Sequence, residues 1–195
     1  MRWEVLMTYR EKKLDSTYSF RGHIVNVRVD HVEAVGGRTA VREVAEHADG
    51  VVMAALLEDG RILLERQFRY AVGKEVLEVP AGKMDPGEEP VGSALRELRE
   101  ETGYRAGKIR ELTSAYSSVG FCTEKLHIFL CTDLTQGERD LDETEDIEII
   151  PYPLEEAWNM TMMGEIEDAK TQIAVLMTME LVRSGKLDEY MEKSE

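Results

Sequence analysis

Near the start of the chain, hydrophobic and polar residues follow the two-residue period of a β-strand. Over residues 18–35, valines alternate with polar side chains, so one face of an extended chain is apolar. Two consecutive glycines then favour a hairpin turn, and residues 39–44 return as a second strand. We therefore predict a small antiparallel β-sheet within residues 1–45. Because this sheet is small and polar on one side, we expect it to pack on the second domain, residues 46–195, or on another copy of the chain.

The pattern changes in the second domain. Residues 51–57 form a continuous apolar run, which is typical of a strand buried on both faces, and residues 61–68 are predicted to return as its hairpin partner. Further strands are predicted at residues 75–79, 112–116, 126–132 and 147–152, and helices at residues 154–163 and 168–183. Strands of this mixed order, followed by helices, predict an α/β/α sandwich around a mixed sheet.

One more helix is predicted from Glu89 to Gly103. An acidic residue stands near its start, Pro90 occupies the first turn, and Gly103 follows the last turn. At 3.6 residues per turn, the helix has an apolar stripe that we expect to be buried, formed by Val91, Ala94, Leu95, Leu98 and Thr102.

A second stripe of this helix is acidic and consists of Glu97, Glu100 and Glu101. Side chains at this spacing are neighbours, and at an effective dielectric constant near 20 each like-charged pair costs about 2–3 kcal/mol. A divalent cation would remove that cost, and oxygen ligands without His or Cys favour Mg²⁺ or Mn²⁺ over Zn²⁺. Taken alone, three such carboxylates are far more typical of a solvated acidic face, where water screens the repulsion.

The surroundings of the acidic stripe favour the metal site. Gly82 is followed after five residues by Glu88, and after seven more by the sequence RELREETG at residues 96–103. This spacing resembles the signature box of the Nudix hydrolases at every fixed position, except that Tyr104 stands where the family usually has an aliphatic residue. The resemblance implies a Nudix fold, in which Gly82, Glu88, Arg96 and Gly103 shape the box. It also implies hydrolysis of a nucleoside diphosphate linked to another group, with metal ligands at Glu97, Glu100, Glu101 and the carbonyl of Ala81.

Segments outside the box resemble the ADP-ribose pyrophosphatase branch of this family. They read QFR, EVLEVPAG, YSSVGFCTEKLHIFL, LDETEDIE and EDAKT, and together they extend the resemblance over roughly residues 18–185. The resemblance implies substrate-binding residues at Phe20, Arg28, Arg42, Arg69 and Glu124. For Arg28, a solvated charge on a strand is an equal alternative. Members of this branch form homodimers by exchanging the N-terminal sheet, so we expect a homodimer that pairs through residues 1–45.

The acidic segment of residues 133–146 carries the remaining candidates. The resemblance implies that Glu143 is the base that activates water and that Glu145 is a further metal ligand, although the two roles could be exchanged. Without the resemblance, either residue would be read as a solvated loop charge. Together with Glu101, Glu143 is expected to be required for catalysis.

One departure from the branch concerns the substrate. A proline usually follows the box in a Ser-Pro-Gly, and this chain has Val119 in its place. Without the fixed φ angle of proline the loop is less rigid. Hydrolysis of ADP-ribose to AMP and ribose 5-phosphate, which the resemblance to the branch implies, is nevertheless the leading hypothesis. Another nucleotide sugar such as GDP-mannose, or an oxidised nucleoside diphosphate, remains an alternative. A Nudix-fold sensor that binds a nucleotide without cleaving it is disfavoured by the intact box.

Composition limits the partners. The formal charge of −15 over 195 residues disfavours binding to nucleic acid, because no basic patch compensates it. Cys122 and Cys131 match no zinc-binding pattern or disulfide framework, which indicates a reducing cytoplasm. The charged start of the chain and the absence of a long apolar run predict neither export nor membrane insertion.

Overall fold

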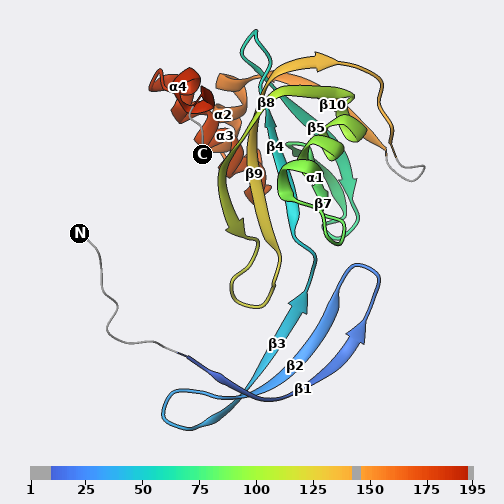
Figure 1. Cartoon of the computed structure of the whole chain (residues 1–195), viewed down its shortest axis with the longest axis vertical. Coiled ribbons are helices and arrows are strands. Elements are labelled where there is room, and N and C mark those ends of the chain that lie inside the picture. The colour runs from blue at the N-terminus through green and yellow to red at the C-terminus, as the bar shows by residue number, and fades with distance from the viewer. Residues whose placement is uncertain (1–9, 142–145, 193–195) are drawn as a thin grey trace. The chain divides into compact units, whose positions relative to one another are not determined.

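A computed structural model of the chain describes residues 10–141 and 146–192 (Figure 1). The chain divides into two compact units. The first contains residues 10–48 and Tyr116–Glu124, and the second contains Asp49–Ala115 and the chain from Lys125 onward.

The first unit is built on a three-stranded antiparallel sheet. Its strands are β1 (Lys12–Arg21), β2 (Asn26–Glu33) and β3 (Thr39–Glu46), in the order β1-β2-β3. The prediction of a single strand over residues 18–35 is wrong, because the chain turns at Gly22 and divides this stretch between β1 and β2. β1 is exposed along its whole length.

The segment Tyr116–Glu124 joins the first unit through backbone hydrogen bonds to the end of β3. The amide of Ala45 donates to the carbonyl of Phe121 at 2.7 Å, and the amide of Thr123 donates to the carbonyl of Ala45 at 3.0 Å. This segment contains Val119, whose side chain is 87% exposed. The loop that departs from the family pattern is therefore held at both sides while its tip faces solvent.

The second unit contains two sheets. One has the order β7-β4-β9-β8, with β4 parallel to β9 and antiparallel to β7, and the other has the antiparallel order β10-β5-β6. Their strands are β4 (Gly50–Ala55), β5 (Arg61–Arg69), β6 (Lys74–Glu78), β7 (Ala81–Lys83), β8 (Tyr104–Tyr116), β9 (Lys125–Gln136) and β10 (Ile147–Pro153). The predicted hairpin of β4 with β5 is wrong. The two strands share only the isolated bridge between Leu56 and Ile62, and β5 pairs with β10 and β6 in the other sheet.

Helices cover both sides of these sheets. α1 (Pro90–Glu97) packs on one side, while α2 (Leu154–Met162) and α3 (Ala169–Arg183) pack on the other. A short helix that the sequence pattern did not predict, α4 (Leu187–Glu192), follows α3. None of the helices in the described residues is long and apolar enough to span a membrane.

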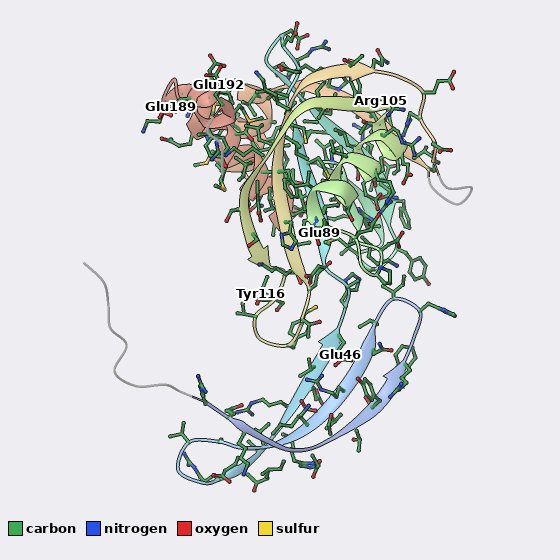
Figure 2. The ribbon with its side chains drawn as sticks, viewed as in Figure 1. Glu46, Glu89, Arg105, Tyr116, Glu189 and Glu192 are labelled. Carbon is green, nitrogen blue, oxygen red and sulfur yellow. The ribbon has the colours of Figure 1, made fainter. Side chains whose placement is uncertain are left out.

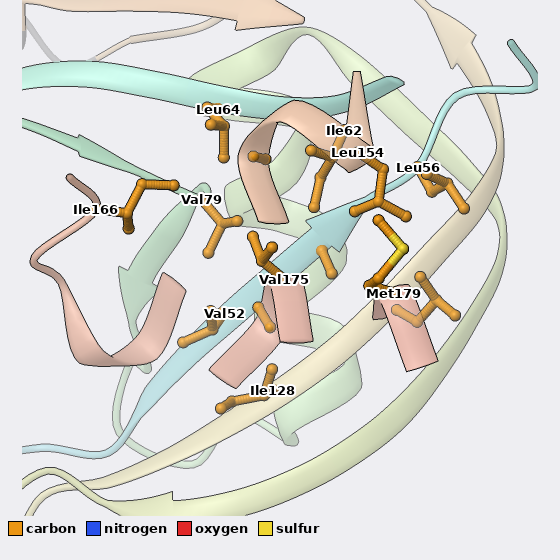
Figure 3. Packing of buried hydrophobic residues seen from close by; sticks show 14 residues of the cluster. Val52, Leu56, Ile62, Leu64, Val79, Ile128, Leu154, Ile166, Val175 and Met179 are labelled. Atoms are coloured by element: carbon orange, nitrogen blue, oxygen red, sulfur yellow. The ribbon is translucent and has the colours of Figure 1, made fainter. Parts of the chain in front are cut away.

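Strand β4 divides the core into two layers. Its even-numbered residues Val52 and Ala54 belong to the cluster that contains Val175 and Met179 of α3 (Figure 3). Its odd-numbered residues, such as Met53, belong to the cluster that contains Ala94 and Leu98 below α1. Because β4 is buried on both faces, it positions α1 against the sheet, and the predicted α/β/α sandwich around a mixed sheet is confirmed.

Candidate active site

The predicted acidic helix is α1 extended by a π-helical turn. Glu89, labelled in Figure 2, has an extended backbone before Pro90, and the π-helical turn (Leu98–Thr102) ends at Gly103, whose φ of 77° is in the left-handed region. A π-helical turn accommodates an extra residue and occurs frequently at functional sites.

The burial of the helix differs from the predicted apolar stripe. Ala94, Leu98 and Thr102 are buried, but Val91 is 45% exposed and Leu95 is 37% exposed. The expectation that these last two residues are buried is therefore wrong. The apolar face that packs on β4 is narrower than the helical wheel suggests. Glu101, by contrast, is only 5% exposed and turns toward the protein.

Arg96 gathers the carboxylates of the box around one guanidinium. Its Nε and Nη2 donate to the two oxygens of Glu88 at 3.0 and 2.9 Å. Its Nη1 donates to Glu97 at 2.8 Å and to Glu100 at 3.0 Å. The guanidinium therefore lies between two of the predicted metal ligands and the glutamate before the helix, and it offsets the repulsion among them.

These contacts shift the pKa values of both partners. Hydrogen bonds from Arg96, Ser93 and the backbone amide of Asp85 lower the pKa of Glu88 to about 2. Bonds to Glu88, and then to the box carboxylates, raise the pKa of Arg96 further above its ordinary value, although partial burial opposes its charge. Arg96 and Glu88 thus form a fixed ion pair at all ordinary pH values.

Gly82 brings the backbone of β7 against the side chain of Glu97. A Cβ atom built on Gly82 would lie 2.5 Å from Oε1 of Glu97 and closer still to the remaining carboxylate atoms. Only glycine leaves room for the carboxylate here, so a predicted ligand is held beside the backbone that carries the carbonyl of Ala81. This arrangement of oxygen donors suits a hard divalent cation.

The carboxylates nevertheless do not form a preassembled cage. In the part of the chain that the structure describes, no three Asp, Glu, His or Cys side chains converge in a geometry that could hold a metal ion. Glu97 and Glu100 are oriented by Arg96, while the Glu101 side chain is buried. The oxygen donors are therefore of the kind that a divalent cation prefers. In this structure, however, Glu97 and Glu100 are oriented toward the Arg96 guanidinium.

Two residues within the predicted acidic loop are bonded to the π-helical turn. Arg139 donates from Nε to the carbonyl of Glu101 at 2.6 Å and from Nη2 to the carbonyl of Ile147 at 2.9 Å. The amide of Asp140 donates to the carbonyl of Glu100 at 3.0 Å. Glu143 and Glu145 themselves lie outside the described residues.

Sequence reasoning did not identify Arg139. The signal was present, because Arg139 is the single basic residue in the acidic stretch of residues 133–146. A lone positive charge in such a stretch marks the point where the segment can be tied to carbonyl groups or carboxylates. Here it links the backbone of Glu101 to the backbone of Ile147, the residue that follows the loop.

Arg69, a predicted substrate residue, lies at the end of β5 and binds a buried carboxylate. Its Nε and Nη2 donate to Oε1 and Oε2 of Glu78 at 2.6 and 3.0 Å, and Glu65 lies 4.0 Å away. Burial opposes the charge of Arg69, but Glu78, Glu65 and Glu101 together raise its pKa. The contribution of Glu101 indicates that Arg69 faces the same region as the box carboxylates.

Arg69 also lines a pocket of about 320 Å³ together with Lys74, Lys170 and Glu78. A larger pocket of about 530 Å³ is lined by residues of α3 and α4, such as Met179 and Met191, on the side of β4 away from α1. Pocket volume alone would therefore place the site on the side of β4 opposite α1, away from the box. We place the candidate site at the smaller pocket, because the predicted substrate arginine lines it.

The other predicted substrate residues belong to the first unit. Arg42 pairs across the sheet with Asp30, two residues from Arg28, so the register places both arginines on one face. Phe20 pairs with Val27, which places it on the opposite face.

Carboxylates hold these arginines. Arg28 donates from Nε to Asp30 at 2.9 Å and also pairs with Glu46, which is labelled in Figure 2. Arg42 donates from Nε to Glu11 at 2.9 Å. The first unit thus presents two arginines whose charges are already partly neutralised.

Glu124 belongs to the first unit as well. Its carboxylate lies 3.2 Å from Nδ1 of His47, a nitrogen that is also 2.7 Å from the carbonyl of Ala48. Carbonyl and carboxylate oxygens accept hydrogen bonds, so this geometry suits an Nδ1–H of His47 that donates to them. The box residues and Arg69 therefore belong to the second unit. The remaining substrate candidates belong to the first, where Phe20 lies on the opposite face of the sheet from Arg28 and Arg42.

Comparisons with known proteins agree with this assignment of the box. The sequence model of the NUDIX domain matches residues 46–172. An ADP-ribose pyrophosphatase from Bacillus subtilis (strain 168) is 37% identical over 172 residues, which cover 87% of this chain and 93% of that protein. A methanol dehydrogenase activator from Bacillus methanolicus is 37% identical over 169 residues, which cover 86% of this chain and 91% of that protein.

A GDP-mannose pyrophosphatase from Pectobacterium atrosepticum is 36% identical over 174 residues, which cover 83% of this chain and 88% of that protein. The crystal structure of an ADP compounds hydrolase superposes with a TM-score of 0.76 at 23% identity, covering 91% of this chain and 97% of that one, and so shares its fold. The complete box, the α/β/α fold and these matches agree, and the chain belongs to the NUDIX domain family.

Proposed function

We propose that this chain is a Mg²⁺-dependent pyrophosphatase that hydrolyses ADP-ribose to AMP and ribose 5-phosphate. The observation that carries the proposal is the complete box, folded so that Glu97 packs against Gly82 and Arg96 gathers Glu97 with Glu100. The similarity to ADP-ribose pyrophosphatases along most of the chain supports the choice of substrate.

Four groups of this chain would hold the metal. They are the carboxylates of Glu97, Glu100 and Glu101 and the carbonyl of Ala81, and Mn²⁺ could replace Mg²⁺ because the donors are all oxygen. When bound, such an ion neutralises the charge on the diphosphate and lowers the pKa of coordinated water. Arg96 orients two of the carboxylates from the side, and Gly82 leaves the space in which Glu97 lies.

The acidic loop supplies the base in this proposal. Glu143 accepts the proton of the attacking water and Glu145 adds a metal ligand, or the two exchange these roles. The contacts of Arg139 and Asp140 with the backbone of the π-helical turn support this placement, because they hold the start of the loop beside Glu100 and Glu101. Water adds to one phosphorus, the bridging P–O bond breaks, and the leaving phosphate takes up a proton.

Substrate recognition is assigned to Arg69 in the second unit and to Phe20, Arg28, Arg42 and Glu124 in the first. An arginine suits the diphosphate because its planar fork gives two parallel hydrogen bonds and its charge is permanent. We also propose that the chain is a homodimer that pairs through its N-terminal sheet, with residues 1–45 as the exchanged part. Sedimentation at micromolar concentration tests this, and a monomer at those concentrations would contradict it.

GDP-mannose is the second candidate substrate. The exposed Val119 in place of the usual proline favours a loop that tolerates a different sugar, and the similarity to GDP-mannose pyrophosphatases supports the same choice. Two relatives at the same 37% identity carry different names, so identity alone does not select the activity.

One experiment separates these activities. The full chain is incubated with Mg²⁺ and ADP-ribose, GDP-mannose or an oxidised nucleoside diphosphate in H₂¹⁸O, and the products are identified by mass, with Glu101→Gln as the control. We expect ADP-ribose to be consumed fastest and one ¹⁸O atom to mark the attacked phosphorus. Faster cleavage of GDP-mannose would favour the second candidate. Nucleotide binding without cleavage would instead indicate a sensor.

A further inference from the structure

A single buried carboxylate holds two cations beside the pocket that Arg69 lines. Glu78 is the last residue of β6 and is only 2% exposed. It accepts two hydrogen bonds from Arg69, at 2.6 and 3.0 Å, and its Oε2 also accepts a bond from the ammonium group of Lys170. Because an unpaired charge is costly in the interior, Glu78 depends on both of these partners.

Lys170 is fixed in place by the start of α3. Asp168 is the N-cap of this helix, where it accepts hydrogen bonds from the amide and hydroxyl of Thr171 at 3.0 and 2.6 Å. The amide of Val79 donates to the same hydroxyl at 2.9 Å, which joins the end of β6 to the helix. The Lys170 ammonium lies 3.0 Å from Asp168, and its side chain is only 14% exposed. The Lys170 ammonium is therefore held between two carboxylates in a largely buried position.

The shared carboxylate determines which edge of Arg69 remains for a ligand. A guanidinium has five N–H donors, and Glu78 occupies one on Nε and one on Nη2. The two donors on Nη1 and one on Nη2 are not used by Glu78. Glu78, Glu65 and Glu101 already exceed the charge of Arg69 and Lys170 together, so loss of the Lys170 cation would increase the excess of negative charge around Arg69.

We propose that Lys170 is a positioning residue for substrate binding. Its ammonium group neutralises Glu78, so that Glu78 can hold the Nε and Nη2 edge of Arg69 while the Nη1 end keeps enough positive charge to bind the diphosphate. This inference rests on the proposed function, in which Arg69 contacts the diphosphate of the substrate. Lys170 acts through Glu78 and Arg69 and does not itself need to contact substrate.

The test is a double-mutant cycle on the full chain, assayed with ADP-ribose and Mg²⁺. Lys170→Met is expected to raise KM about tenfold to a hundredfold, the range for loss of a charge-assisted hydrogen bond, with a much smaller change in kcat. In the Arg69→Met background the same substitution is expected to change KM less than about twofold, because its effect passes through Arg69. Lys170→Arg, which keeps the charge, should restore most of the lost affinity.

Lys108→Met is the matched control. Lys108 pairs with Asp133 and makes no hydrogen bond or ion pair with Glu78 or Arg69 in the part of the chain that the structure describes, so KM should stay within about twofold of the natural chain. Should Lys170→Met fail to fold, the double variant Glu78→Gln with Lys170→Met removes both charges together. That variant is expected to melt cooperatively and to regain most of the affinity, because the charge that Lys170 neutralises is removed with it; a KM raised as far as in Arg69→Met would overturn the proposal.

The outcomes separate this inference from the function on which it rests. Equal increases in KM from Lys170→Met with and without Arg69 would show that Lys170 acts independently, which overturns the proposal. An equal loss from Lys108→Met would reduce the effect to the overall charge of the chain, with the same consequence. If Arg69→Met alone leaves KM unchanged, the assignment of Arg69 in the proposed function fails first, and the role of Lys170 fails with it.

Discussion

Replacing Gly82 by alanine gives the sharpest test of how the box is built. The added Cβ would lie 2.5 Å from Oε1 of Glu97, whereas ordinary contact begins at 3.4 Å. The new Cβ is attached to the backbone of β7, which is less free to move than a side chain. The Glu97 carboxylate must therefore move away by at least about 0.9 Å, the difference between these two distances. Its hydrogen bond to Arg96, 2.8 Å long, would be lengthened or broken.

The size of the effect follows from this displacement. A misplacement of about 1 Å at a catalytic group can cost about a hundredfold in rate, which corresponds to about 2.7 kcal/mol. We expect kcat for ADP-ribose hydrolysis at saturating Mg²⁺ to fall by about that factor. The assay is AMP release measured by chromatography, with circular dichroism melting to confirm that the variant is folded.

The chain offers a matched control for this substitution. Gly92 lies inside α1, and a Cβ atom added there meets nothing within 4 Å. Gly92→Ala should therefore leave kcat unchanged and stabilise the fold by about 0.5–1 kcal/mol, since alanine is the better helix former. If Gly82→Ala keeps kcat within about threefold of the natural chain, far short of the loss worked out above, the position of Glu97 against β7 is not needed for catalysis.

Three further substitutions test other parts of the site. Glu101→Gln should lower kcat at least about a hundredfold while the melting temperature is kept, and near-normal turnover at saturating Mg²⁺ would contradict its role as a ligand. Glu88→Gln should destabilise the fold above pH 4.5, the ordinary pKa of a glutamate. This loss in the free energy of unfolding should shrink as pH falls toward 2, where Glu88 is protonated in the folded chain. A difference that does not depend on pH in denaturant titrations would refute this. Leu98→Ala should cost about 2–5 kcal/mol in urea unfolding because the side chain is fully buried, whereas Leu95→Ala, at a partly exposed position, should cost less than about 1 kcal/mol.

The sequence pattern predicted the strands better than their partners. The apolar run at β4 indicated a strand buried on both faces, and burial of every residue from Gly50 to Ala55 confirms it. The tight turn after it suggested a hairpin with β5, but β5 joins the other sheet. A local turn fixes the direction of the chain, whereas strand pairing depends on distant segments such as β10, which a local pattern cannot specify.

Within the candidate site, spacing identified the residues and tertiary contacts decided their surroundings. The helical wheel placed Glu97 and Glu100 together, and in the structure they share one guanidinium. The wheel could not show that Val91 and Leu95 are partly exposed, because the neighbours that cover a helix come from elsewhere in the chain. The sequence pattern also did not reveal the role of Lys170, because Lys170 is linked to Arg69 through Glu78, which lies 92 positions away from Lys170 in the chain.

The grip of Arg96 on the box has a consequence for how the protein reaches its active form. Repulsion among closely spaced carboxylates would oppose folding in a chain that has not yet met a metal ion. Here a tethered guanidinium acts as an internal counter-ion for Glu97 and Glu100, so the polypeptide can fold first and be loaded afterwards. Metal binding is then an exchange, in which a free cation competes with the Arg96 guanidinium for the carboxylates. The effective concentration of that guanidinium is set by its attachment to the same chain.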